Sequence, residues 1–175
     1  MTGGDGIEFY NLKGAVVQVP PAELAGVVMT AGLNFGRYRR CVVVIEAGSW
    51  GEDDHGAATQ DEVIRLCRQH PNGDRIKLYM RRAKEADEKR DLQTKRFGFS
   101  TSGHTRPVLL KEYKKWLDGG MFKLNDPRQQ EEHNTFVFNE DGRPQATDGT
   151  KDDGVMCNAF AVQGYAQQPS ELEVF

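Results

Sequence analysis

A continuous apolar run, Cys41-Val42-Val43-Val44-Ile45, constrains the fold of this chain more than any other feature. Most of its residues are β-branched, which favours an extended strand. The run contains no polar residue that would mark a solvent-facing side, and such runs are typical of strands covered on both faces of a sheet. We therefore expect helices to pack on this strand.

Helices and strands alternate along the chain, which predicts an α/β fold. Apolar residues at helical spacing, together with capping and stop signals, predict four helices, at residues 21–35, 59–70, 107–118 and 152–163. The second of these starts at a capping box, Thr59-Gln60-Asp61-Glu62. Further strands are expected at residues 7–11, 15–19, 76–80 and 136–138. The first two form a hairpin, so the sheet should be mixed, with helices flanking it.

The remaining segments and the bulk composition indicate one soluble domain. A chain of 175 residues with 38% hydrophobic and 28% charged content suits a single core, which we place at residues 1–165, followed by a polar tail at 166–175. We expect loops at 81–96, which is almost wholly polar, and at 139–149, which is rich in turn residues.

The cysteines and the apolar segments bear on the compartment. Cys41, Cys67 and Cys157 are odd in number and far apart, which argues against a disulfide framework or a zinc site and fits a reducing cytoplasm. The N-terminal residues lack a secretory pattern. No apolar run approaches the roughly 18 residues of a membrane span, so no membrane association is expected.

Three carboxylates stand where strands end and helices begin. Glu46 follows the apolar run directly, and Asp152 and Asp153 are adjacent at the start of the last predicted helix. Many metal-dependent nucleases hold divalent cations with such acids, because magnesium prefers oxygen ligands and two ions about 4 Å apart can assist phosphodiester hydrolysis. The sequence therefore points to Glu46, Asp152 and Asp153 as metal-binding, catalytic residues.

Structural explanations compete with each of these functional ones. An acid often follows a buried strand, and Asp at a helix start is favoured by capping and by the helix dipole. His104 lies in a small polar segment that either meets phosphate or caps the next helix through Thr105. The net charge is −3, so any surface that binds DNA must be local.

Several segments, in this order, carry a family resemblance: Ile7-Glu8-Phe9-Tyr10, Pro21-Ala22-Glu23-Leu24-Ala25, Val42-Val43-Val44-Ile45-Glu46 with Gly51, Phe97-Gly98-Phe99-Ser100-Thr101-Ser102, Thr105-Arg106-Pro107, Glu132 to Thr135-Phe136, and Gly149 to Met156. Together they resemble the C-terminal nuclease domain of the large terminase subunit of tailed bacteriophages. The similar stretch covers most of residues 7–165.

The resemblance implies an RNase H-like fold that uses Mg²⁺ or Mn²⁺ to cut concatemeric double-stranded DNA with little sequence specificity. By position, Glu46 matches the strand-end acid of the family, and Asp152 or Asp153 matches its helix acid, with Asp152 the first choice. The implied partners are the terminase ATPase domain, the small terminase subunit and the portal. The implied location is the cytoplasm of the infected bacterial host.

The chain differs from the family pattern in two places. We expect it to begin after the family's first strand, which carries a catalytic Asp, and Asp5 is then the nearby candidate ligand. Lys151 stands where the family usually has His, and it either contacts phosphate or is solvated. Contacts to the DNA backbone are expected from basic and polar residues: Arg81, Arg82, Lys84, Lys95, Arg96, His104, Arg106 and Lys151.

Two other functions compete with the nuclease. The chain is alternatively a non-catalytic assembly module that binds DNA or packaging partners, in which the acids only cap helices and contact solvent. It is alternatively another RNase H-like enzyme such as a resolvase, which would prefer branched over linear DNA. Loss of cleavage in Glu46→Ala separates the first hypothesis from the assembly module.

Overall fold

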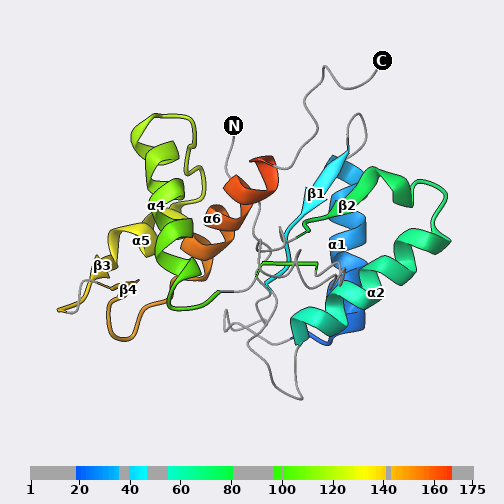
Figure 1. The fold of residues 1–175 in the computed structure, drawn as a ribbon, viewed down its shortest axis with the longest axis horizontal. Coiled ribbons are helices and arrows are strands. Elements are labelled where there is room, and N and C mark those ends of the chain that lie inside the picture. Colours follow the sequence, from blue (N-terminus) through cyan, green and yellow to red (C-terminus); the bar gives the residue numbers. More distant parts are fainter. Residues whose placement is uncertain are drawn as a thin grey trace, which may run out of the picture. The chain divides into compact units, whose positions relative to one another are not determined.

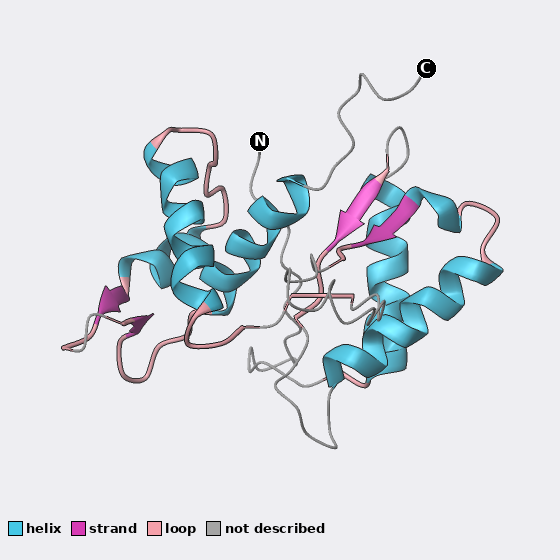
Figure 2. Ribbon diagram, in the orientation of Figure 1, coloured by secondary structure: helices cyan, strands magenta, loops and turns pink. Residues whose placement is uncertain are grey.

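The computed structural model describes residues 19–35, 40–46, 55–80, 97–99, 101–140 and 143–166. Their contacts divide the chain into two compact units, shown in Figures 1 and 2. The N-terminal unit comprises the described residues within 19–101, and the C-terminal unit is Ser102–Ala166. The predicted hairpin before residue 19, the segment 81–96 and the tail after 166 lie outside the described residues. The single domain expected over residues 1–165 stays a prediction.

The N-terminal unit is a small α/β layer. Its elements are α1 (Pro21–Phe35), β1 (Cys41–Val43), α2 (His55–Gln69), the short 3-10 helix η1 (Gly73–Arg75) and β2 (Ile76–Leu78). β1 and β2 are parallel, and α2 lies in the crossover that parallel strands require. α1 contacts both strands and packs along α2. The α/β class predicted from the alternating pattern is confirmed.

The core of this unit is formed by one face of α1 and the sheet. Ala25 and Met29 of α1 pack with Val63 of α2 and with the β2 side chains Ile76 and Leu78, all of them buried. The β1 residues are only half-buried, so the full coverage expected from the apolar run is not found for them.

The C-terminal unit is helical with one hairpin. Helices α4 (Thr105–Asp118), α5 (Pro127–Asn134) and α6 (Asp153–Ala166) surround a core of apolar side chains from α4 and α6. α6 packs against both α4 and α5. The strands β3 (Phe136–Phe138) and β4 (Pro144–Ala146) pair antiparallel. No described helix is both long and apolar enough to cross a bilayer.

Three elements differ from the sequence prediction. The capping box at 59–62 is wrong, because α2 begins earlier, at His55, and Thr59 and Gln60 are buried inside it. α5 was not predicted, and neither was β4, which lies in the segment expected to be a turn-rich loop. The four predicted helices all exist, with starts shifted by zero to four residues.

Candidate functional site: strand-end and helix-start carboxylates

The segment 97–99 enters the sheet of the N-terminal unit beyond the ends of β1 and β2. Tyr79 N–H donates to the Val43 carbonyl at 2.8 Å, and Gly98 N–H in turn donates to the Tyr79 carbonyl at 2.8 Å. Phe99 N–H donates to the Ile45 carbonyl at 3.0 Å, and Glu46 pairs with Phe99 as a parallel bridge. The chain thus builds short, mixed pairing at the carboxyl end of the parallel strands, which is where ligands bind in open α/β sheets.

Gly98 permits this close approach. Its φ is +78°, and a Cβ there would lie 2.2 Å from Gln60 Nε2 and 2.5 Å from the Ile45 carbonyl oxygen. Both distances are far below van der Waals contact. Gln60 is buried on α2, and its Nε2 has no hydrogen-bond partner within the described part of the chain. Only glycine therefore fits between α2 and the extension of β1.

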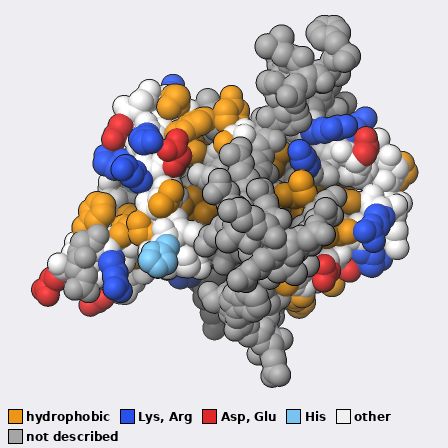
Figure 3. All heavy atoms as spheres, viewed as in Figure 1, with side chains coloured by type: hydrophobic (Ala, Val, Ile, Leu, Met, Phe, Trp, Pro, Cys, Tyr) orange, Lys and Arg blue, Asp and Glu red, His pale blue; other side chains and the backbone are white. Residues whose placement is uncertain are grey.

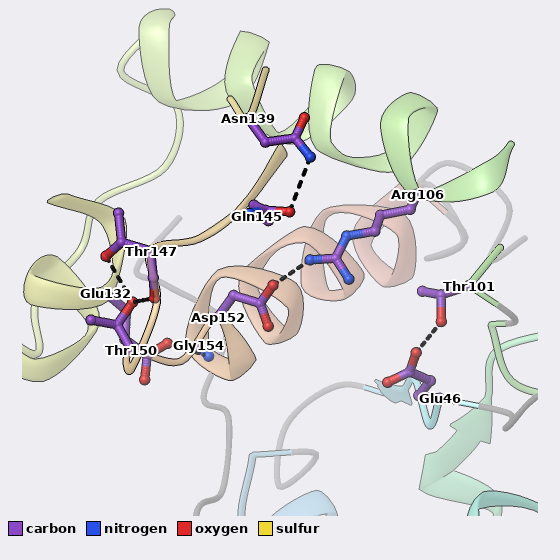
Figure 4. Close-up of polar contacts among 10 residues, drawn as sticks. All are labelled: Glu46, Thr101, Arg106, Glu132, Asn139, Gln145, Thr147, Thr150, Asp152 and Gly154. Atoms are coloured by element: carbon purple, nitrogen blue, oxygen red, sulfur yellow. Dashed lines mark hydrogen bonds and ion pairs between the residues drawn. The ribbon is translucent and has the colours of Figure 1, made fainter. Parts of the chain in front are cut away.

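Glu46 is exposed at this edge and, among the residues that the structure describes, a neutral donor holds it. The Thr101 hydroxyl donates to Glu46 Oε1, as Figure 4 shows. A hydroxyl donor orients the carboxylate without cancelling its charge. The structure thus places Glu46 at the strand end predicted from the sequence. In the sequence, Thr101 belongs to a segment that carries the family resemblance, and no local signal predicts its contact with Glu46.

The acid pair lies at the start of α6, in the C-terminal unit. Arg106 of α4 donates from Nη2 to Asp152 Oδ2, and both side chains are partly exposed, at 33% and 26%. Asp153 is the first residue of α6 and is exposed. Asp152 and Arg106 were predicted separately, as a metal ligand and a DNA contact, and the structure brings them together as an ion pair.

A carboxylate from α5 caps α6. Glu132 Oε2 accepts from the Gly154 N–H at 2.6 Å, so one of the free amide groups of the first turn is satisfied by another helix. The sequence predicted that the Asp pair could cap this helix. At the Gly154 amide the cap is Glu132 instead. Glu132 appeared in the sequence analysis only within a family segment.

The remaining predicted contacts near these helix starts are on the surface. Ser102 and Thr105 cap α4 reciprocally: Ser102 N–H donates to Thr105 Oγ1 at 2.8 Å, and Thr105 N–H donates to Ser102 Oγ at 3.1 Å. The helix amide at Thr105 is thus capped by Ser102, and the Thr105 hydroxyl accepts from the preceding turn. His104 and Lys151 are exposed.

A second histidine has a structural role inside the C-terminal unit. His133 Nδ1 lies 2.5 Å from the Gln129 carbonyl oxygen, which only accepts, so Nδ1 carries the proton and Nε2 accepts from the Tyr113 hydroxyl at 2.7 Å. Burial lowers the pKa of His133 and raises the pKa of Tyr113. Both groups therefore stay neutral and link α4 to α5.

The donor chemistry suits magnesium, but no complete ligand set is described. Carboxylate oxygens are the ligands Mg²⁺ prefers. Among the described residues, however, no three His, Cys, Asp or Glu side chains lie close enough together to hold an ion. Glu46 belongs to the N-terminal unit, and Asp152 and Asp153 belong to the C-terminal unit.

Several predicted site residues lie outside the described part of the chain: Asp5, Arg81, Arg82, Lys84, Lys95 and Arg96. On the face that Figure 3 shows, the described Lys and Arg side chains lie in small groups among Asp and Glu side chains.

Comparison of the chain with protein-family models, with characterised proteins and with solved structures finds no match. The resemblance to terminase nucleases therefore rests on the sequence segments alone.

Proposed function

We propose that this chain is the metal-dependent endonuclease domain of a viral DNA-packaging terminase, with an RNase H-like fold built on a mixed central sheet. One observation carries the proposal: Glu46 is an exposed carboxylate at the carboxyl end of parallel strands, and the neutral Thr101 hydroxyl holds it. Within the described residues no ion pair involves Glu46, whereas an acid that serves only to balance a basic neighbour would be paired with a cation. The substrate is concatemeric double-stranded DNA, cut with little sequence specificity.

The helix-start acids supply the other half of the proposed chemistry. Asp152 directly precedes α6 and Asp153 begins it, and a bound Mg²⁺ or Mn²⁺ would neutralise phosphate charge and lower the pKa of a water. Arg106, His104 and Lys151 are the described candidates for contacts to the DNA backbone. The ATPase domain, the small terminase subunit and the portal are the proposed partners, in the cytoplasm of an infected bacterium.

The first test is cleavage of supercoiled plasmid with Mn²⁺, with Mg²⁺ and with chelator. Glu46→Gln keeps the size of the side chain and an oxygen that accepts from Thr101, but it removes the charge. We expect it to abolish metal-dependent cutting, as should Asp152→Asn/Asp153→Asn. Asp61→Asn, an exposed acid on α2, is the matched control and should cut like the parent. Cutting that survives both chelator and Glu46→Gln would refute the proposal.

The second test concerns the DNA backbone. If Arg106 and Lys151 contact phosphates, affinity for duplex DNA falls steeply between about 50 and 200 mM salt. Lys151→Gln should make that fall shallower, by about one unit of slope in a plot of log affinity against log salt. Lys114→Gln is the control, because Lys114 is already paired with Asp118 on α4. Affinity independent of salt would rule out backbone contacts.

A non-catalytic assembly module is the second candidate, and one contact favours it. The Arg106 guanidinium already neutralises Asp152, which leaves that carboxylate less charge for a cation. Under this hypothesis the chain binds DNA without cutting it under any metal condition, and Asp152→Asn lowers the melting temperature through loss of the Arg106 ion pair.

A further inference from the structure

The contact between Glu132 and Gly154 has a geometry that fixes α6 as well as capping it. An ionised carboxylate accepting from an N–H at 2.6 Å makes a charge-assisted hydrogen bond, which is about twice as strong as a neutral one. The carboxylate also lies at the positive end of the α6 dipole. This bond therefore ties the first turn of α6 to α5.

A second hydrogen bond joins the same two helices, one turn later in α6 and one turn earlier in α5. Asn158 Nδ2 donates to Gln129 Oε1 at 3.2 Å, and Asn158 is fully buried. Gln129 precedes Glu132 by three residues, and Asn158 follows Gly154 by four. The pairs 132–154 and 129–158 thus run antiparallel, and two bonds one turn apart fix the rotation of α6 about its axis as well as its position.

The close packing of α5 side chains against Gly154 leaves no room for a side chain at this position. A Cβ at residue 154 would lie 2.7 Å from Glu132 Oε2 and 3.4 Å from Gln129 Cγ. Gly154 is buried, so its backbone meets the two α5 side chains directly. Any side chain at 154 would have to displace the carboxylate.

Asp153 is the first residue of this fixed turn and Asp152 directly precedes it, so the rotation of α6 sets the direction of both carboxylates. Arg106 holds Asp152 from the α4 side. We infer that Glu132 is a positioning residue for the acid pair, acting through the backbone N–H of Gly154 and not by touching the substrate. We call the bonds Glu132–Gly154 and Gln129–Asn158 the α5–α6 clamp. The effect of Glu132 on catalysis rests on the proposed nuclease function, whereas the clamp itself does not.

The clamp is tested first without any cleavage, by NMR of the full chain. The chemical shift of the Gly154 amide proton should change with pH as the Glu132 carboxylate ionises. Glu132→Gln should remove most of that change while keeping an oxygen acceptor. Glu131→Gln, on the exposed neighbour, is the control. The Arg106 Nη2–H resonances report the Asp152 ion pair and should shift in Glu132→Ala but not in Glu131→Ala. Curves for Glu132→Gln that superimpose on those of the parent and of Glu131→Gln would overturn the inference.

The positioning role is then tested in cleavage. Glu132→Ala should lower kcat about tenfold, as loss of a group that orients a ligand typically does. The Kd for DNA should be unchanged, and Glu132→Gln should restore most of kcat. Equal kcat in Glu132→Ala and Glu131→Ala would overturn the positioning role. A parent chain that does not cut DNA refutes the nuclease instead, and the NMR result still decides the clamp.

Discussion

Replacing Gly98 with alanine tests whether the segment 97–99 is packed as closely as its geometry indicates. Alanine at φ +78° costs about 1–2 kcal/mol in backbone energy. The methyl group would also overlap Gln60 Nε2 and the Ile45 carbonyl oxygen, and overpacking adds about 1–3 kcal/mol. We expect Gly98→Ala to destabilise the N-terminal unit by about 2–5 kcal/mol.

A matched glycine separates the two contributions. Gly120 also has positive φ, at +65°, but a Cβ there would meet nothing within 4 Å. Gly120→Ala should therefore cost only the backbone contribution, about 1–2 kcal/mol. The difference between the two variants measures the crowding at Gly98.

Native-state hydrogen exchange is the appropriate assay, because it reports the stability of each unit separately. Amides of α2 and β2 report on Gly98→Ala, and amides of α4 report on Gly120→Ala. A crowding energy of about 2 kcal/mol corresponds to roughly thirtyfold faster exchange. Adding Gln60→Ala should recover part of the loss, since it removes one of the two overlapping groups. If Gly98→Ala accelerates exchange no more than Gly120→Ala does, the close packing is refuted.

Three further predictions use described residues of both units. Gly26→Ala, on the exposed face of α1 with nothing within 4 Å of the added methyl, should raise the free energy of unfolding by about 0.5–1 kcal/mol in urea titration. Ser102→Ala should cost about 1 kcal/mol and speed exchange in the first turn of α4, because it removes one half of the reciprocal cap with Thr105. Burial lowers the pKa of His133, so below about pH 6.5 the unfolded chain binds a proton first, and stability falls as the pH drops through the folded-state pKa. His133→Asn should flatten that part of the melting-temperature profile.

The sequence predicts elements whose local signals and packing agree. α1, α4 and α6 carry apolar residues at helical spacing, so burial and backbone preference favour the same structure. α5 has no apolar stripe to find, although the pair Asp126-Pro127 is a usable start signal: the Asp126 side chain accepts from the Arg128 N–H at 2.9 Å. The capping pattern at Thr59 failed because a helix that begins earlier buries the same residues.

Local sequence signals place the candidate site residues on their elements but do not predict which of them contact one another. Glu46 was placed at a strand end from its neighbours alone, but its partner Thr101 is 55 residues away. Arg106 and Asp152 are 46 residues apart and were assigned different roles. β4, with the sequence Pro-Gln-Ala, has little strand preference and is extended because it pairs with β3. Contacts between distant segments depend on packing that no single stretch of sequence specifies.

The division at Thr101 and Ser102 has a consequence for synthesis on the ribosome. The described contacts of the N-terminal unit all involve residues that emerge before Ser102. The described part of that unit can therefore form on a nascent chain while the C-terminal unit is still being translated, because domains generally fold as units in the order in which they are made. Glu46 and Thr101 would then meet before Asp152 and Asp153 have been added to the chain.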